Sequence, residues 1–292
     1  MTIFTSPEGK ARLADWHERF RARLGRPTES RCVPTRFGTT HALLCGPPEA
    51  PPLVLLHGAL ASSAHALGEV AALADEYRVY AIDVIGQSPM SAEARPDVNG
   101  PAYGEWLWDT LNALSLTDPV RVVAVSWGGF VALRAAALAP ERITKLSLVV
   151  PAGLVQGAGI EGFTRVGLPM MLYRAFPSRA RLEQSVAHLF TTTDPYWLDY
   201  MGDALRDFKL DFRPPRLVRD GELSGLKAPV QVFGAERDLS FPGAALLARA
   251  QQVFPNLAHA ELLRGARHAP SFEPAARREL TAAIATFLRD ET

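Results

Sequence analysis

The chain of 292 residues has few cysteines, no excess of charge of either sign and no long apolar run. Lysine and arginine together number 31, as do aspartate and glutamate, so no net positive field attracts nucleic acid or anionic lipid. No stretch approaches the roughly 20 apolar residues that span a bilayer, and the first residues lack the apolar centre of a signal peptide. We therefore expect a cytoplasmic protein that binds neither nucleic acid nor membrane.

The two cysteines, Cys32 and Cys45, stand in segments predicted to be strands on either side of Gly38-Thr39. If Gly38-Thr39 forms a two-residue turn, the cysteines face each other across a hairpin. We expect both to be reduced, partly buried side chains in a cytosolic protein, without a catalytic role.

Short apolar runs alternate with stretches of helical periodicity along most of the chain. Each run is too short for a helix and too uniformly apolar for a strand with one exposed face, which predicts buried parallel strands. The stretches between them have the apolar spacing of the helices that connect parallel strands. The sequence therefore predicts an α/β fold with a doubly covered sheet. The strand-like runs are 53–56, 79–82, 120–125, 146–150 and 230–233, and the clearest helical stretches are 106–114, 130–138 and 244–253. Residues 258–263 are expected to form a last strand.

Residues 153–225 interrupt this alternation. The segment is rich in Phe, Tyr, Met and Arg and contains no strand-like run, which predicts a helical insertion. Most of its apolar side chains are expected to pack the insertion against itself and the main domain. As a group they predict an apolar roof over a substrate pocket. The pocket candidates are Phe163, Met170, Met171 and Trp197, together with Leu60 from the main domain.

Ser126 stands at the junction between a buried strand and a helical stretch. A tight strand-to-helix turn strains the serine backbone and exposes its hydroxyl, and Gly128 and Gly129 leave the turn unobstructed. The helix that follows offers unpaired N–H groups, of which the Trp127 amide is the first candidate to stabilise an oxyanion. The alternative role of Ser126 is to cap the helix. Ala124 replaces the first glycine of the G-x-S-x-G pattern, a departure of one methyl group.

A second candidate oxyanion donor follows the first buried run, in the sequence His57-Gly58-Ala59-Leu60. Gly58 permits a sharp turn after the strand, so the next amide can point toward the site. Ala59 is the first choice for this donor and Leu60 the second. His57 is expected to hydrogen-bond the loop backbone rather than to transfer protons.

The candidate acid and base follow the last two buried runs. Asp238 lies just after the run 230–233, where a carboxylate can accept the imidazole Nδ1–H and stabilise the imidazolium. Glu236 is the second choice for the acid, and either residue could instead belong to an ordinary loop before a helix. His268 lies on a loop after the last run, and its place in the order Ser, Asp, His indicates a general base.

These motifs together resemble the α/β-hydrolase superfamily, in particular its esterases with a helical cap between the sixth and seventh core strands. The resemblance covers residues 36–288, and the segment 83–88 is similar to the family's D-x-x-G-x-G-x-S loop, shortened by two positions. It implies a hydrolase core formed by residues 1–152 and 226–292, with a mostly parallel, doubly wound sheet and residues 153–225 as the cap. It also implies chemistry that needs no metal and no organic cofactor.

The predicted function is a serine hydrolase that cleaves a carboxylic ester or related acyl bond of a small to medium apolar substrate. His268 takes the proton of Ser126 as the serine attacks the acyl carbon, and water later releases the acid from an acyl-enzyme while Asp238 stays ionised. Two alternatives stay open. Cofactor-free perhydrolase activity uses the same three residues, and a non-catalytic protein can use the same fold to bind a small ligand.

Overall fold

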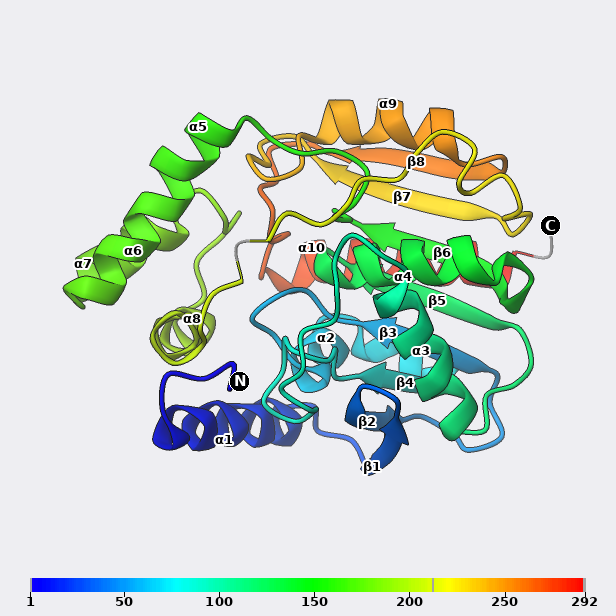
Figure 1. Ribbon diagram of the computed structural model, residues 1–292, viewed down its shortest axis with the longest axis horizontal. Coiled ribbons are helices and arrows are strands. Elements are labelled where there is room, and N and C mark those ends of the chain that lie inside the picture. Colours follow the sequence, from blue (N-terminus) through cyan, green and yellow to red (C-terminus); the bar gives the residue numbers. More distant parts are fainter. Residues whose placement is uncertain (1, 212, 291–292) are drawn as a thin grey trace.

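An eight-stranded sheet forms the centre of the structure, a computed structural model that describes residues 2–211 and 213–290 (Figure 1). The strand order is β1-β2-β4-β3-β5-β6-β7-β8. β1 pairs antiparallel with β2 and β2 antiparallel with β4, whereas all later pairs are parallel. The predicted mostly parallel α/β sheet is thus confirmed. The strands are β1 (Thr28–Thr35), β2 (Gly38–Cys45), β3 (Pro52–Leu56), β4 (Arg78–Ile82), β5 (Val120–Val125), β6 (Ile143–Val149), β7 (Val230–Ala235) and β8 (Leu257–Leu263).

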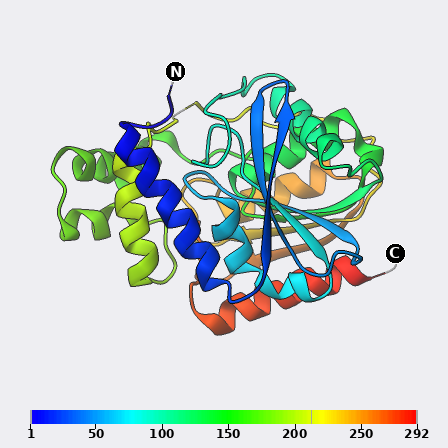
Figure 2. The same cartoon turned by 90° about the horizontal axis from the view of Figure 1, so that it is seen from below.

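Helices cover both faces of the sheet. The core on one face contains side chains of α3 (Ala102–Ala113), α4 (Trp127–Leu138) and α9 (Gly243–Val253). The core on the other face contains side chains of α1 (Pro7–Arg23), α2 (Ser63–Glu69) and α10 (Pro274–Arg289). The view from below shows α1 crossing this second face beside α2 and α10 (Figure 2). Short 3-10 helices at Ala71–Asp75 and Pro140–Arg142 complete the connections.

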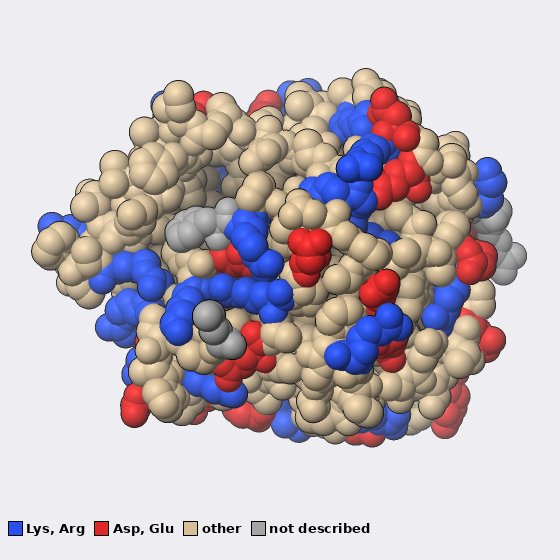
Figure 3. All heavy atoms as spheres, viewed as in Figure 1, with Lys and Arg blue, Asp and Glu red and all other residues tan. Residues whose placement is uncertain are grey.

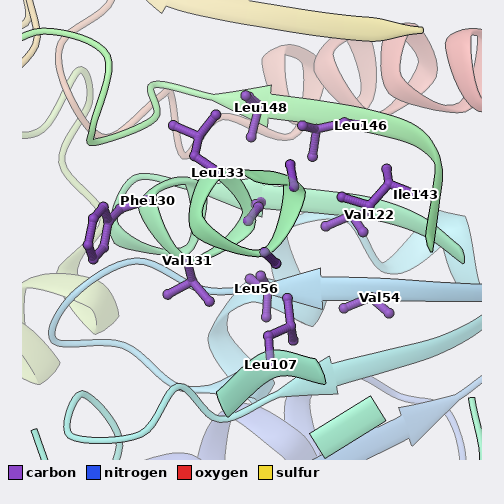
Figure 4. Close-up of a cluster of buried hydrophobic side chains, with 14 of the residues drawn as sticks. Val54, Leu56, Leu107, Val122, Phe130, Val131, Leu133, Ile143, Leu146 and Leu148 are labelled. Carbon is purple, nitrogen blue, oxygen red and sulfur yellow. The ribbon is translucent and has the colours of Figure 1, made fainter. Parts of the chain in front are cut away.

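The inner strands β3, β5 and β7 are apolar along most of their length because their side chains meet one of the two helical layers, whereas the edge strands β1 and β8 are largely exposed. In β5, Val122 and Ala124 belong to the core beneath α4, whereas Val123 belongs to the core beneath α10. Figure 4 shows Val122 of β5 in one apolar cluster with the α4 side chains Val131 and Leu133. Burial of one such side chain stabilises the folded protein by roughly 1.5–3 kcal/mol, so these two helical layers hold the strands and their ends in place.

The segment between β6 and β7 is helical, as predicted, and contains no strand among its described residues. It lies beyond the carboxyl ends of the parallel strands (Figure 1). α5, a π-helical turn and α6 follow one another directly, and α8 packs against α1. The elements are α5 (Gly159–Gly162), the π-helical turn (Phe163–Gly167), α6 (Leu168–Ala175), α7 (Arg179–Val186) and α8 (Pro195–Asp207).

The predicted turn at Gly38-Thr39 is wrong. Thr35 pairs with Gly38, so the two residues of the turn are Arg36-Phe37 and Gly38 begins β2. Gly38 has φ = +116°, and a Cβ there would lie 2.6 Å from the Cβ of Ala92. The glycine is therefore required by its backbone conformation and by a close neighbour, not by a place inside the turn.

The register of this hairpin also separates the cysteines, contrary to the prediction. Cys32 lies opposite His41, and Cys45 lies opposite Thr28 at the far end of the hairpin. Both thiols are free; Cys32 is exposed and Cys45 is buried.

Positive and negative side chains are interspersed on the face shown in Figure 3. The arrangement agrees with the equal numbers of basic and acidic residues in the sequence. Within residues 2–211 and 213–290, no helix has both the length and the apolar character needed to cross a membrane.

We predict that Gly104→Ala destabilises the protein by about 1–3 kcal/mol, since overpacking forces neighbouring groups apart. A Cβ at Gly104 would lie 2.6 Å from the carbonyl oxygen of Arg134, where α3 packs on α4. Gly159→Ala in α5 is the matched control, because nothing lies within 4 Å of a Cβ there. Urea unfolding monitored by circular dichroism measures both variants. Equal free energies of unfolding for Gly104→Ala and Gly159→Ala would contradict the role of this close packing.

Candidate active site

Ser126 occupies a strained turn between β5 and α4. Its φ of +50° and ψ of −113° are rare for a residue with a side chain, and its N–H donates to the carbonyl of Val149 at 3.0 Å. A Cβ at Gly128 would lie 2.6 Å from the carbonyl oxygen of Leu56, and one at Gly129 would lie 2.5 Å from Pro151. The turn therefore needs glycine at both positions.

Ala124, the departure from the glycine of the family pattern, is fully buried in the core beneath α4. Its methyl group is part of the packing on that face of β5.

Three side chains form a hydrogen-bonded chain at the carboxyl edge of the sheet. Ser126 Oγ lies 2.9 Å from His268 Nε2, and His268 Nδ1 lies 2.8 Å from Asp238 Oδ2. The other carboxylate oxygen of Asp238 accepts the N–H groups of Ser240 at 2.8 Å and Phe241 at 3.1 Å. The structure thus brings together the three residues predicted as nucleophile, base and acid, and it fixes the carboxylate from two sides.

The electrostatics of this chain favour an imidazole that can accept a proton. Burial opposes the charged form of His268, but the Asp238 carboxylate outweighs burial and raises the pKa of His268 above its usual value. With Nδ1–H donating to Asp238, Nε2 is left to accept the proton of the Ser126 hydroxyl. The arrangement suits proton transfer from the serine to the histidine.

Glu236, the second choice for the acid, lies elsewhere. Its carboxylate accepts the Gly265 N–H at 2.7 Å and pairs with Arg264 at 3.0 Å. These contacts lower the pKa of Glu236, with the backbone hydrogen bond from Gly265 as the largest cause. Glu236 therefore holds the loop that leads to His268 and does not contact the imidazole.

The loop after β3 lies directly against the nucleophile. A Cβ at Gly58 would lie 3.3 Å from the Cβ of Ser126, so a side chain here would crowd the serine. His57 Nε2 accepts the Val84 N–H at 2.9 Å, which leaves Nδ1–H to donate to the Gly58 carbonyl at 2.7 Å. His57 thus holds the loop backbone, in the role that the sequence predicts for it.

Two backbone segments border the nucleophile, the loop after β3 and the start of α4. Leu60, on the loop after β3, has φ = +55°, which turns the chain sharply after Ala59. Trp127 is the first residue of α4, so its N–H has no carbonyl partner within the helix. Both candidate donors, Ala59 and Trp127, are therefore on segments whose ends meet at Ser126.

Asp83 anchors this region, a role that the sequence motif alone does not reveal. Its buried carboxylate lies 2.6 Å from His41 Nδ1 and accepts the hydroxyl of Ser88 at 2.6 Å. It also accepts both the N–H and the hydroxyl of Ser63, the first residue of α2. Burial opposes ionisation, yet the hydrogen bond with His41 outweighs burial and lowers the pKa of Asp83. The carboxylate therefore connects β2, the start of α2 and the loop after β4.

Further histidines are buried beside Asp83. The hydroxyl of Ser62 lies 3.0 Å from His17 Nδ1 and 2.6 Å from His65 Nδ1. Burial lowers the pKa of His17, His57 and His65. Protonation of these imidazoles is opposed in the folded protein, since a charge on any of them would be costly in this enclosed region.

The helical segment is hydrogen-bonded to the loops of the acid and the base. The Gly157 N–H donates to the carbonyl of Ser240 at 2.8 Å, two residues beyond Asp238. The Thr191 hydroxyl donates to the carbonyl of Ala269 at 2.7 Å, one residue beyond His268.

A third contact joins the segment to the loop after β3. The hydroxyl of Tyr200, in α8, donates to the carbonyl of Leu60 at 2.5 Å. Tyr200 is fully buried, and nothing in the sequence pattern distinguishes it from the other aromatic residues of the segment.

The five residues predicted to line the pocket lie in different surroundings. Phe163 and Met171 are 54% and 49% exposed and face solvent. Met170 and Leu60 pack against the core beneath α10, and Trp197 stacks on Phe272 with ring centroids 5.1 Å apart. The exposed pair belongs to an apolar stripe on α5, the π-helical turn and α6. The stripe comprises Ile160, Phe163, Leu168, Met171, Leu172 and Phe176.

Metal ligands are not clustered in the described part of the chain: no group of three or more His, Cys, Asp or Glu residues there could hold an ion.

Comparison with known proteins relates this geometry to a family. A family model described as "alpha/beta hydrolase fold" matches residues 51–165. Carboxylesterase YbfK of Bacillus subtilis is 29% identical over 261 residues, which are 85% of this chain and 84% of that protein. The uncharacterized carboxylesterase nap of the same bacterium is 28% identical over 263 residues, or 82% of this chain and 81% of that protein.

Solved structures show the same fold. The structure of naproxen esterase (carboxylesterase NP) from B. subtilis has a TM-score of 0.83 at 22% identity and covers 97% of this chain and 99% of its own. Carboxylesterase CesB (YbfK) from B. subtilis has a TM-score of 0.80 at 23% identity and the same coverage.

We predict that stability falls as the pH is lowered from 7.5 to 5.5. The lowered pKa values of His17, His57 and His65 mean that the folded protein binds protons there less readily than the unfolded chain, which takes them up below about pH 6.5. His268, whose pKa is raised, makes the opposite contribution to the change of stability with pH, but it is one group against three. Urea unfolding at each pH measures the free energy of unfolding.

The matched variants are His65→Phe, which keeps an aromatic ring in the buried site, and His259→Phe at an exposed position. We expect the first to flatten the pH dependence and the second to leave it unchanged. A pH dependence that His65→Phe does not alter would exclude His65 from the effect.

Proposed function

The chain belongs to the α/β-hydrolase superfamily, and we propose that it hydrolyses carboxylic esters through an acyl-enzyme formed on Ser126. The observation that carries this proposal is the chain of hydrogen bonds from Ser126 through His268 to Asp238, with the serine on a strained turn before α4. A small-ligand binding protein has no need of an imidazole aligned between a serine and a buried carboxylate. The carboxylesterases of B. subtilis that are similar over most of their length support the same reaction.

In the first half of the reaction, His268 Nε2 accepts the hydroxyl proton while Ser126 Oγ attacks the acyl carbon. Asp238 stays ionised and stabilises the imidazolium that forms. His268 then donates the proton to the oxygen of the leaving alcohol, and the ester bond breaks. In the second half, His268 takes a proton from water, which attacks the acyl-enzyme and releases the acid.

The developing oxyanion is stabilised by the amides of Ala59 and Trp127 in this proposal. Both belong to segments that border the Ser126 side chain, and the Trp127 N–H lies at the positive end of the α4 dipole. His57 and Asp83 act through the loop that carries Ala59, since both hold its backbone or its flanking helix.

Residues 153–225 serve as a cap over the carboxyl edge of the sheet. Their bonds to the loops beyond Asp238 and His268 support this role, and their apolar residues favour small to medium hydrophobic esters.

Replacing the nucleophile by Ser126→Ala is expected to lower kcat/KM for p-nitrophenyl butyrate by about 10⁴-fold or more, because triad members act as a unit. Ser224→Ala, at an exposed loop position, is the control and should retain full activity. A fluorophosphonate probe should label the parent and the control but not Ser126→Ala. Undiminished hydrolysis by Ser126→Ala would refute the mechanism. Failure of the probe to label the parent, together with no hydrolysis of any ester, would favour a binding protein.

Asp238→Asn is expected to lower kcat by about 10³–10⁴-fold and to move the acid limb of the pH profile to lower pH. The sign follows from the electrostatics: Asp238 raises the pKa of His268, so without its charge the imidazole stays neutral to lower pH. The pH dependence of kcat/KM reports this limb. Glu236→Gln is the matched control and should leave the limb in place, as Glu236 does not contact His268. If the acid limb moved equally in Asp238→Asn and Glu236→Gln, Asp238 would not be the carboxylate that sets the pKa of His268.

A further inference from the structure

Tyr200 connects the helical segment to the loop that carries one of the proposed oxyanion donors. It lies in α8, which packs against α1, and the two helices lie side by side in both views of the fold (Figures 1 and 2). Its hydroxyl donates to the carbonyl of Leu60, in the loop after β3. Tyr200 is 1% exposed, and burial raises the pKa of its hydroxyl, so the group stays protonated and able to donate. One buried side chain of the helical segment therefore holds this loop by its backbone.

Aromatic rings around Tyr200 limit the movement of its hydroxyl. The tyrosine ring lies edge-on to Trp16 and Phe20 of α1, with centroids 5.8 Å and 5.6 Å away. On its α2 side it is tilted over the imidazole of His65, with centroids 4.2 Å apart. Two helices of the core thus pack around the ring, and the hydroxyl has little freedom to turn away from Leu60.

The loop adopts a conformation that needs such support. Leu60 has φ = +55°, which a residue with a bulky side chain rarely adopts. Nearer the strand, His57 Nδ1–H donates to the Gly58 carbonyl at 2.7 Å. Because the peptide unit is planar, this bond also sets the direction of the Ala59 N–H in the same unit. Tyr200 holds the Leu60 carbonyl, so the loop is fixed by one hydrogen bond before Ala59 and by another after it.

The position of this amide matters more to the transition state than to the bound ester. A Cβ at Gly58 would lie 3.3 Å from the Cβ of Ser126, so the loop backbone passes directly beside the nucleophile. A displaced amide bonds less well to the oxyanion, which forms only as the serine attacks. Resting on the proposed esterase function, we propose that Tyr200 is a positioning residue, whose hydroxyl holds the loop through Leu60 so that the Ala59 amide faces the developing oxyanion.

The test removes the hydroxyl and keeps the ring. We expect Tyr200→Phe to lower kcat for p-nitrophenyl butyrate by about 10–100-fold, somewhat less than the loss of a whole donor, while KM stays within about twofold. Tyr173→Phe is the matched control, because Tyr173 is also buried and its hydroxyl donates to the Gly202 carbonyl at 3.1 Å, within the helical segment. Both variants lose one hydroxyl-to-carbonyl bond, so their unfolding temperatures should fall by similar amounts. Tyr173→Phe should keep the kcat of the parent.

A tetrahedral adduct reports on the donor directly. Ser126 Oγ adds to the carbonyl carbon of an alkyl trifluoromethyl ketone, its proton passes to His268, and the carbonyl oxygen becomes an oxyanion like that of the reaction. The inhibition constant should rise by about 10–100-fold in Tyr200→Phe, in parallel with the loss of kcat, and stay unchanged in Tyr173→Phe. A purely structural role for the hydroxyl would lower the unfolding temperature but leave kcat and the inhibition constant of the folded enzyme unchanged.

Labelling of Ser126 by a fluorophosphonate, carried to completion, counts the folded sites, so kcat is expressed per labelled serine. Should Tyr200→Phe fail to fold, Tyr200→Met is measured instead, since its flexible side chain fills the same space without a hydroxyl. A folded variant with the kcat and the inhibition constant of the parent would overturn the proposal. So would a change confined to KM, because the hydroxyl would then act on substrate binding alone.

The outcome for the esterase function is separate. If the parent hydrolyses esters and Tyr200→Phe does so equally well, only the positioning role fails. If the parent hydrolyses no ester and takes up no probe, the proposed function itself fails.

Discussion

Parallel strands bring their carboxyl ends to one edge of a sheet, and this constraint places every residue of the candidate site. Ser126 follows β5, Asp238 follows β7 and His268 follows β8, while the loop that carries Ala59 follows β3. Ser126 and His268 are 142 positions apart in sequence but within hydrogen-bonding distance at this edge. The helical layers on both faces hold the strands in register, so the core brings the three loops to one edge, and hydrogen bonds within the loops then orient Asp238 and His268.

The strained backbone conformation of Ser126 persists because the contacts around it hold it in place. A residue in such a conformation costs roughly 1–3 kcal/mol. Its N–H bonds to Val149, the neighbouring glycines allow close approach of β3 and of Pro151 just after β6, and Trp127, which follows it, is buried. The buried carboxylate of Asp83 acts similarly for the neighbouring loop, since it accepts hydrogen bonds from Ser63, Ser88 and His41 in a region that water does not reach.

Sequence patterns predicted the sheet, its parallel strands, the helical segment after β6 and the three aligned residues, since apolar periodicity and chain order report directly on these features. They failed where an outcome depends on contacts between distant segments. Gly38 was read as a turn residue because its neighbour Ala92, 54 positions away, is invisible to local reasoning. The anchoring role of Asp83 was missed for the same reason, although its place after a buried strand was a signal. Exposure of Phe163 and Met171 depends on the orientation of the π-helical turn and α6, which composition does not report.

Gly157, Thr191 and Tyr200 have a consequence for how proteins of this fold diversify. Each joins the helical segment to a different loop of the core: the loops beyond Asp238 and His268, and the loop beside Ala59. The segment is therefore not a detachable module. A shorter chain that connected β6 directly to β7 would lose all three supports at once, and an exchanged segment from a relative would need matching partners in three places. New specificities in this architecture should arise by coordinated change of the segment and these loops rather than by transplantation of the segment alone.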